Sequence, residues 1–149
     1  MRGLKTYAIG GVLLWAGAVA MAQTPAKVTT PEQYDKVMKT VGPAHAATNK
    51  ALKSAAYADA RTSLKTVKDN LMLARTFWVE KKIDPALKLA DDAIAKADAL
   101  DKALAAATPD SAAVMAAAQA YGASCMACHK EYRIRDAEGN FIMDPAKVK

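Results

Sequence analysis

Apolar residues recur at alternating spacings of three and four along most of this chain, and no stretch alternates strictly between apolar and polar positions. That spacing is typical of a helix with one buried stripe, whereas a half-buried strand needs a period of two. Glycine is scarce between residues 30 and 135, where alanine, leucine, lysine and aspartate dominate. The sequence therefore predicts an all-α fold in which helices bury their stripes against one another.

Start and stop signals divide this region into four predicted helices. Thr30 is an N-cap that Gln33 completes as a capping box, with Pro31 at the first helical position, and this helix runs to about Ser54. Pro43 lies inside it and lacks an amide donor, so we expect a kink or a break there.

The second predicted helix spans residues 57–82, and the third opens with Asp84 as N-cap and Pro85 after it and ends before Pro109. The residues expected to be buried are Tyr57, Ala60, Leu64, Val67, Leu71, Ala74 and Trp78 in the second helix, and Leu87, Ala90, Ile94, Ala97 and Leu104 in the third.

The fourth predicted helix opens near Asp110 or Ser111. Short links between successive helices favour antiparallel neighbours, so we expect an up-down-up-down four-helix bundle over residues 23–135, followed by a tail over 136–149. The inward stripe of the fourth helix consists of Val114, Ala118, Tyr121, Cys125, Cys128 and Tyr132.

Cys125, Cys128 and His129 form a C-x-x-C-H motif and include the only two cysteines of the chain. This is the attachment signature of c-type haem. Two thiols at this spacing can add to the two vinyl groups of one porphyrin, and the adjacent imidazole is then free to bind the iron. Because both cysteines lie on the inward stripe, we expect one covalent haem near the C-terminal end of the last helix, against the bundle interior.

Three other interpretations of the cysteine pair stay open. A thioredoxin-like redox motif needs a strand-helix-strand setting, which is not predicted here. A structural zinc site needs four ligands, and only His129 and the distant His45 are there to join the thiolates. A disulfide in an otherwise haem-free helical protein leaves His129 unexplained.

The first residues have the features of a secretory signal peptide. Arg2 and Lys5 precede an uncharged apolar run, and Ala20-Met21-Ala22 is an A-x-A site, so residues 1–22 are predicted to be removed. An uncleaved anchor is the alternative, but the run is short for a membrane span, so no stable membrane anchor is expected. Together with C-x-x-C-H, this indicates a periplasmic protein, since haem is attached to c-type cytochromes on that side of the membrane.

Charge excludes some functions. Loss of Arg2 and Lys5 lowers the formal net charge from +6 to +4, and the lysines are scattered as on solvated helix faces, so no nucleic acid partner is expected. No nucleophile-base pair or pair of carboxylates at catalytic geometry is evident, so the chain is not predicted to be an enzyme.

From Cys125 to His129, followed by Tyr132-Arg133, the chain resembles the class II cytochromes c, the family of cytochrome c-prime and its low-spin relatives. The resemblance implies a periplasmic four-helix bundle with thioethers at both cysteines and His129 as the proximal iron ligand. It also implies that Arg133 lies near the haem on the proximal side. Tyr132 is either part of this site or ordinary core, and Arg133 otherwise caps a solvated helix end.

The residue on the other face of the iron decides the function. In this family the first helix supplies it, and the segment around Met38 is similar to that of the low-spin relatives, where a methionine binds the iron. Met38 is therefore the predicted sixth ligand, with His45 as a competitor that is more often solvent-exposed at such a position. Methionine ligation predicts a carrier of single electrons between redox partner proteins. An open position predicts a high-spin protein that binds NO or CO, and the resemblance also allows a homodimer.

The chain departs from the family at two places. Tyr34 stands where relatives often have an arginine, and the chain continues well beyond Arg133. Within this tail, residues 138–140 predict a turn, with Phe141–Met143 returning as a short extended segment. We expect the tail to cover either the haem edge or a face of the bundle.

Overall fold

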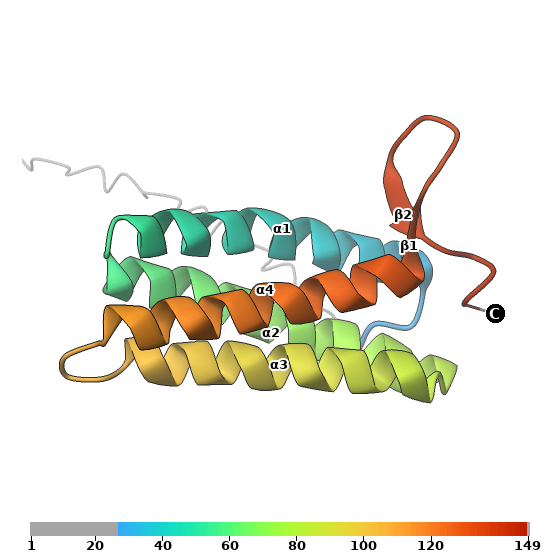
Figure 1. Ribbon diagram of the computed structural model, residues 1–149. Coiled ribbons are helices and arrows are strands. Elements are labelled where there is room, and N and C mark those ends of the chain that lie inside the picture. The colour runs from blue at the N-terminus through green and yellow to red at the C-terminus, as the bar shows by residue number, and fades with distance from the viewer. Residues whose placement is uncertain (1–26, 149) are drawn as a thin grey trace, which may run out of the picture.

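The computed structural model describes residues 27–148 and contains four helices and one short hairpin (Figure 1). The all-α prediction is confirmed, whereas the predicted signal peptide, residues 1–22, lies outside the described residues. None of the described helices is long and apolar enough to cross a membrane. The elements are α1 (Pro31–Lys53), α2 (Tyr57–Lys81), α3 (Asp84–Leu104), α4 (Ser111–Tyr132), β1 (Arg133–Arg135) and β2 (Phe141–Met143).

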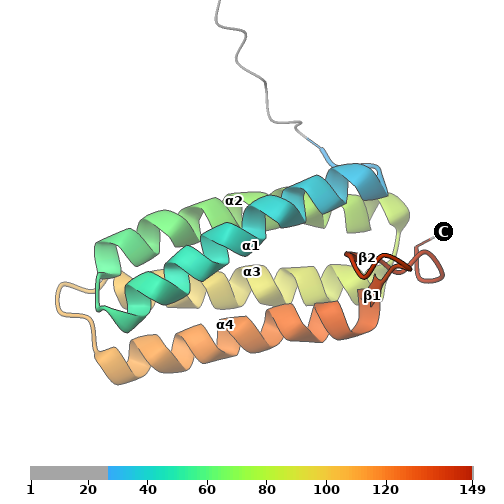
Figure 2. The ribbon, with the colours of Figure 1, turned by 90° about the horizontal axis from the view of Figure 1, so that it is seen from above.

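Successive helices are antiparallel neighbours: α1 packs against α2, α2 against α3, and α3 against α4 (Figures 1 and 2). The fourth side of the bundle differs, because α1 and α4 scarcely approach each other. The core accordingly forms two clusters. Met38 packs against both of them. One cluster contains Leu52, Leu64, Leu100, Leu104, Val114 and Tyr121, and the other, at the hairpin end, contains Val28, Val37, Phe77, Trp78 and Ala86.

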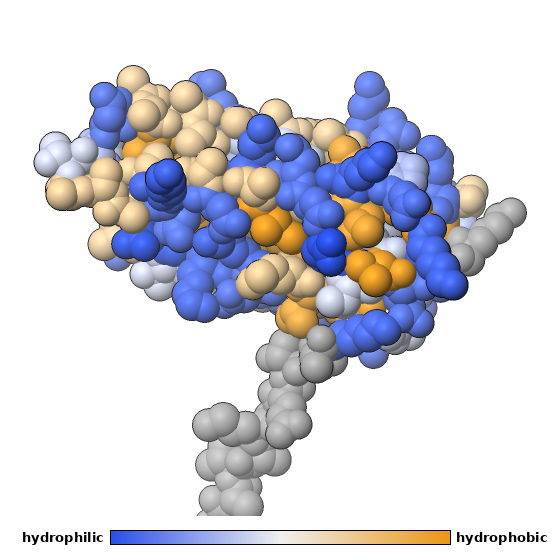
Figure 3. Space-filling model, turned by 90° about the horizontal axis from the view of Figure 1, so that it is seen from below, coloured by the Kyte–Doolittle hydropathy of each residue, from blue (hydrophilic) through white to orange (hydrophobic). Residues whose placement is uncertain are grey.

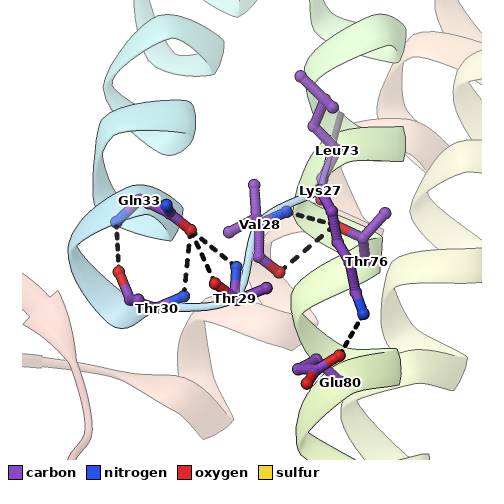
Figure 4. Close-up of polar contacts among 8 residues, drawn as sticks. All are labelled: Lys27, Val28, Thr29, Thr30, Gln33, Leu73, Thr76 and Glu80. Carbon is purple, nitrogen blue, oxygen red and sulfur yellow. Dashed lines mark hydrogen bonds and ion pairs between the residues drawn. The ribbon is translucent and has the colours of Figure 1, made fainter. Parts of the chain in front are cut away.

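The start of α1 is held by the contacts drawn in Figure 4. The predicted capping box is present between Thr30 and Gln33. Just before it, the Val28 side chain is fully buried and its backbone N–H donates to Thr76 Oγ1 of α2 at 2.8 Å. The expected break at Pro43 is absent, because α1 continues unbroken to Lys53. An exposed proline costs the helix one hydrogen bond, which the packing of the following residues offsets.

Ion pairs join α2 to α3 on the outside of the bundle. Arg61 Nε lies 2.9 Å from Asp101 Oδ1, and Lys68 Nζ lies 2.6 Å from Asp98 and 3.1 Å from Asp101. Seen from below, with α3 nearest the viewer, the surface shows hydrophilic side chains interspersed with apolar areas (Figure 3). The scattered charges thus form a solvated face, as predicted.

Two details of α3 correct the prediction. Ile83 is the N-cap and Asp84 already belongs to the first turn, without a side-chain cap. The fully buried stripe runs one residue earlier than expected over the first half of the helix, so that Leu87 and Ile94 are only half-buried at its flank. Small alanines occupy the seam because they let the neighbouring helices approach closely. The buried residues are Ala86, Ala93, Ala97, Leu100 and Leu104.

The chain turns back directly after α4. β1 pairs antiparallel with β2, with Arg133 opposite Met143, and Gly139 in the connecting turn has φ of +82°, a value that favours glycine. The predicted turn and returning segment are confirmed. The start of β1 at Arg133 was not predicted, because the sequence placed this residue at the end of the fourth helix.

Candidate haem site

A cavity of about 820 Å³ occupies the side of the bundle where α1 and α4 stand apart. Its lining is mostly apolar, and all four helices and the hairpin contribute to it. Every residue that the sequence singled out for haem or iron lines this one cavity: Met38, Cys125, Cys128, His129, Tyr132 and Arg133. The competing ligand His45 lines it too.

The α4 wall carries the C-x-x-C-H motif. Cys125 and Cys128 are both free and half-buried, and both line the cavity, while Cys125 also packs against the core cluster that contains Leu64 and Tyr121. Burial raises the pKa of both thiols, that of Cys128 to about 11 with a further contribution from Cys125. Burial first, and then the charges of Arg133 and His45, lower the pKa of His129. At neutral pH this wall therefore presents two protonated thiols and a neutral imidazole.

The register between α1 and α4 places Met38 level with the motif. The rings of His45 and Tyr121 lie 5.2 Å apart edge to face, which fixes these two residues at the same height. α1 and α4 are antiparallel, so seven residues from His45 toward the hairpin lead to Met38, and seven residues from Tyr121 in the same direction lead to Cys128. Both steps are about 10 Å long. Met38 thus lies opposite His129's turn of helix, while His45 lies about two turns away from it.

A cluster of four aromatic rings joins α1, α2 and α4 at the hairpin end of the cavity. Trp78 contacts Tyr34, Phe77 and Tyr132 with ring centroids 5.0–5.1 Å apart. Tyr34, which departs from the family pattern, packs here, and burial strongly raises its pKa, so its hydroxyl stays protonated. Phe77 is fully buried core, whereas Trp78, which was expected to be buried, is 1% exposed and also lines the cavity.

Two buried polar atoms at the other end of the cavity have no hydrogen-bond partner: His45 Nδ1 and the Tyr121 hydroxyl. His45 Nε2 is 2.9 Å from the side-chain amide nitrogen of Asn49. His45 is half-buried, so the expectation of an exposed side chain is wrong, and burial lowers its pKa. Edge-to-face packing against Tyr121 explains why His45 is half-buried. The sequence around His45, a lone histidine soon after a proline, did not indicate this contact.

The hairpin lines one end of the cavity. Arg133, Asn140, Ile142 and Met143 all contribute to the lining, so the tail covers the cavity as well as packing on α1. Of these, only Arg133 was predicted as a site residue. The sequence predicted the turn but held no signal for where the hairpin would dock.

Within residues 27–148 no three His, Cys, Asp or Glu side chains are grouped so that they would hold a metal ion. Comparisons with protein families, curated proteins and solved structures found no match. The resemblance to the class II cytochromes c therefore stays a prediction from the sequence.

Proposed function

We propose that this cavity holds one covalently attached c-type haem and that the protein carries single electrons between redox partner proteins in the periplasm. The observation that carries this proposal is the convergence on one cavity of the C-x-x-C-H motif from α4 and Met38 from α1. The motif and Met38 come from opposite walls of the cavity, and α1 and α4 make few other contacts with each other.

The cavity suits a large, flat and mainly apolar group. Its volume falls within the range of roughly 300–1,000 Å³ that is typical of cofactor sites, and its lining is mostly apolar with a few polar groups. The unpartnered Tyr121 hydroxyl and His45 Nδ1 also indicate that something absent from the protein alone belongs in this space.

Each residue has a role that follows from its state in the cavity. A bound haem supplies one-electron redox chemistry at its iron. Cys125 and Cys128 would fix it through two thioethers, and the neutral imidazole of His129 is the form that binds iron. Met38 offers an uncharged thioether sulfur from the opposite wall, and methionine ligation raises the reduction potential. Trp78 and the hairpin would limit water access.

An absorption spectrum tests the proposal on protein expressed with the haem maturation machinery, both oxidised and dithionite-reduced, with and without CO. We expect a low-spin spectrum that CO leaves unchanged. Met38→Ala should convert it to a high-spin, CO-binding form. His45→Ala, the matched control on the same helix, should keep the low-spin spectrum.

Other outcomes would replace the proposal. A high-spin wild-type spectrum that shifts with CO would favour the gas-binding alternative. Loss of the low-spin spectrum in His45→Ala but not in Met38→Ala would reassign the sixth ligand. Protein without covalent haem would favour the disulfide or zinc interpretation of the cysteine pair.

A further inference from the structure

A shallow hollow lies on the outer side of the last turns of α4. Met126, Lys130, Arg133 and Phe141 line it together with two alanines and His129. His129 also lines the cavity, so this residue lies between the proposed haem and the outside. We call this surface the outer hollow.

The apolar part of the outer hollow is exposed. Met126 is 60% exposed and Phe141 is 48% exposed. Large side chains this accessible, gathered around one depression and rimmed by charge, are typical of a surface that a protein partner covers.

The charged part of the outer hollow is positive. The guanidinium carbons of Arg133 and Arg135 lie 4.1 and 4.0 Å from the centroid of the Phe141 ring, so two cations flank one aromatic side chain. Among the described residues no carboxylate forms an ion pair with Lys130, Arg133 or Arg135.

The acidic residues nearest in sequence, Glu131, Asp136 and Glu138, do not line the outer hollow. Glu131 pairs with Lys147 at 3.4 Å. Asp136 accepts hydrogen bonds from the backbone and side-chain nitrogens of Asn140, at 2.7 and 3.1 Å. The unpaired positive charge around an exposed apolar centre is therefore complementary to an acidic surface.

We propose that the outer hollow is the docking surface for an acidic protein partner, which exchanges electrons with the haem by way of His129. This inference rests on the proposed function and names the partner of the same site. An acidic partner fits because opposite charge accelerates encounter and orients the two proteins, while Met126 and Phe141 provide the apolar contact. A second copy of this chain would bring the same positive charge to the surface and be repelled.

Electron transfer to small charged probes tests the electrostatic part. Stopped-flow oxidation of the reduced protein is compared for hexacyanoferrate(III), an anion, and tris(phenanthroline)cobalt(III), a cation. With the anion, Lys130→Glu should slow the reaction roughly threefold to tenfold and weaken its dependence on ionic strength. Lys53→Glu, at the far end of α1, makes the same change in net charge and should have little effect. Equal effects of the two variants would overturn the proposal.

Titration of 15N-labelled protein with poly-L-glutamate tests the location. We expect amide shifts that concentrate at Met126, Lys130 and Phe141 and that Lys130→Glu reduces. Shifts spread evenly over lysines of other faces would overturn the proposal, as would binding to anionic lipid vesicles without binding to poly-L-glutamate. A dimer in sedimentation that Met126→Glu dissociates would assign the outer hollow to a second copy instead.

The two proposals fail in different ways. Absence of a haem spectrum refutes the proposed function, and the titration can then still show whether the outer hollow binds an acidic chain. A normal low-spin spectrum without localised shifts refutes only the docking surface.

Discussion

Replacing Trp78 by alanine should be the most damaging change near the cavity. The side chain is 1% exposed and contacts Tyr34, Phe77 and Tyr132, so it connects α1, α2 and α4. Truncation of a buried tryptophan costs about 3–5 kcal/mol, a range that already includes the loss of its contacts with neighbouring rings. We expect the free energy of unfolding to fall by roughly 4 kcal/mol, a large part of the total for a small domain.

Urea unfolding followed by far-UV circular dichroism measures this loss. Val79→Ala is the matched control, because Val79 is the next residue on α2 and is 46% exposed, and its replacement should change the unfolding free energy by less than about 0.5 kcal/mol. Should Trp78→Ala fail to fold, Trp78→Phe keeps one ring in the cluster and should show a smaller loss. If Trp78→Ala costs no more than Val79→Ala, the aromatic cluster does not hold the helices together as argued.

Three further changes test the fold. Pro43→Ala should raise the free energy of unfolding by up to about 3 kcal/mol, since it restores an amide donor at an exposed position inside α1; a decrease in chemical denaturation would contradict this. Asp110→Ala removes the oxygen that accepts from Ala113 N–H at 2.8 Å and should cost about 1 kcal/mol in thermal or urea unfolding. The Arg61 hydrogen bond, opposed by partial burial and assisted by Lys68, lowers the pKa of Asp101. Asp101→Asn should therefore lower the free energy of unfolding by up to about 1 kcal/mol at pH 7. The difference in unfolding free energy between variant and wild type should shrink as the pH falls below 3.8, the ordinary pKa of aspartate. A difference that does not depend on pH would refute the role of this ion pair.

Local rules predicted most of the helices. Capping residues have side chains that satisfy backbone amides, and such signals act over a few residues, so Thr30 and Asp110 marked two helix starts correctly. Most of the stripe of α2 was also predicted, because its spacing is regular: Ala60, Leu64, Val67, Ala74 and Trp78 are buried, whereas Tyr57 and Leu71 are half-buried. In α3 the large residues Leu87 and Ile94 drew the prediction one position away from the alanines that form the seam. Hydrophobicity alone does not distinguish an alanine that permits close approach from one on the surface.

The candidate site was predictable only where one segment carries it. Cys125, Cys128 and His129 are adjacent in sequence and chemically distinctive, whereas Met38 required a resemblance to propose it. The contact of His45 with Tyr121 depends on the register of two helices far apart in sequence. No local pattern encodes that register, and the position of Phe141 between two arginines likewise depends on a strand pairing that forms after α4 ends.

The separation of α1 and α4 is itself built into the fold. At one end the Tyr34, Trp78 and Tyr132 rings fill the space between these helices, and at the other end His45 and Tyr121 meet edge to face. Bulky rings at both ends hold the two helices apart over the stretch between them, which is where Met38 and the C-x-x-C-H motif face the cavity. The width of the cavity is therefore set by the packing of these aromatic side chains at its two ends. For the haem carrier that we propose, helices fixed at both ends would limit the change in shape that accompanies a change of one electron, which links the aromatic packing to the proposed function.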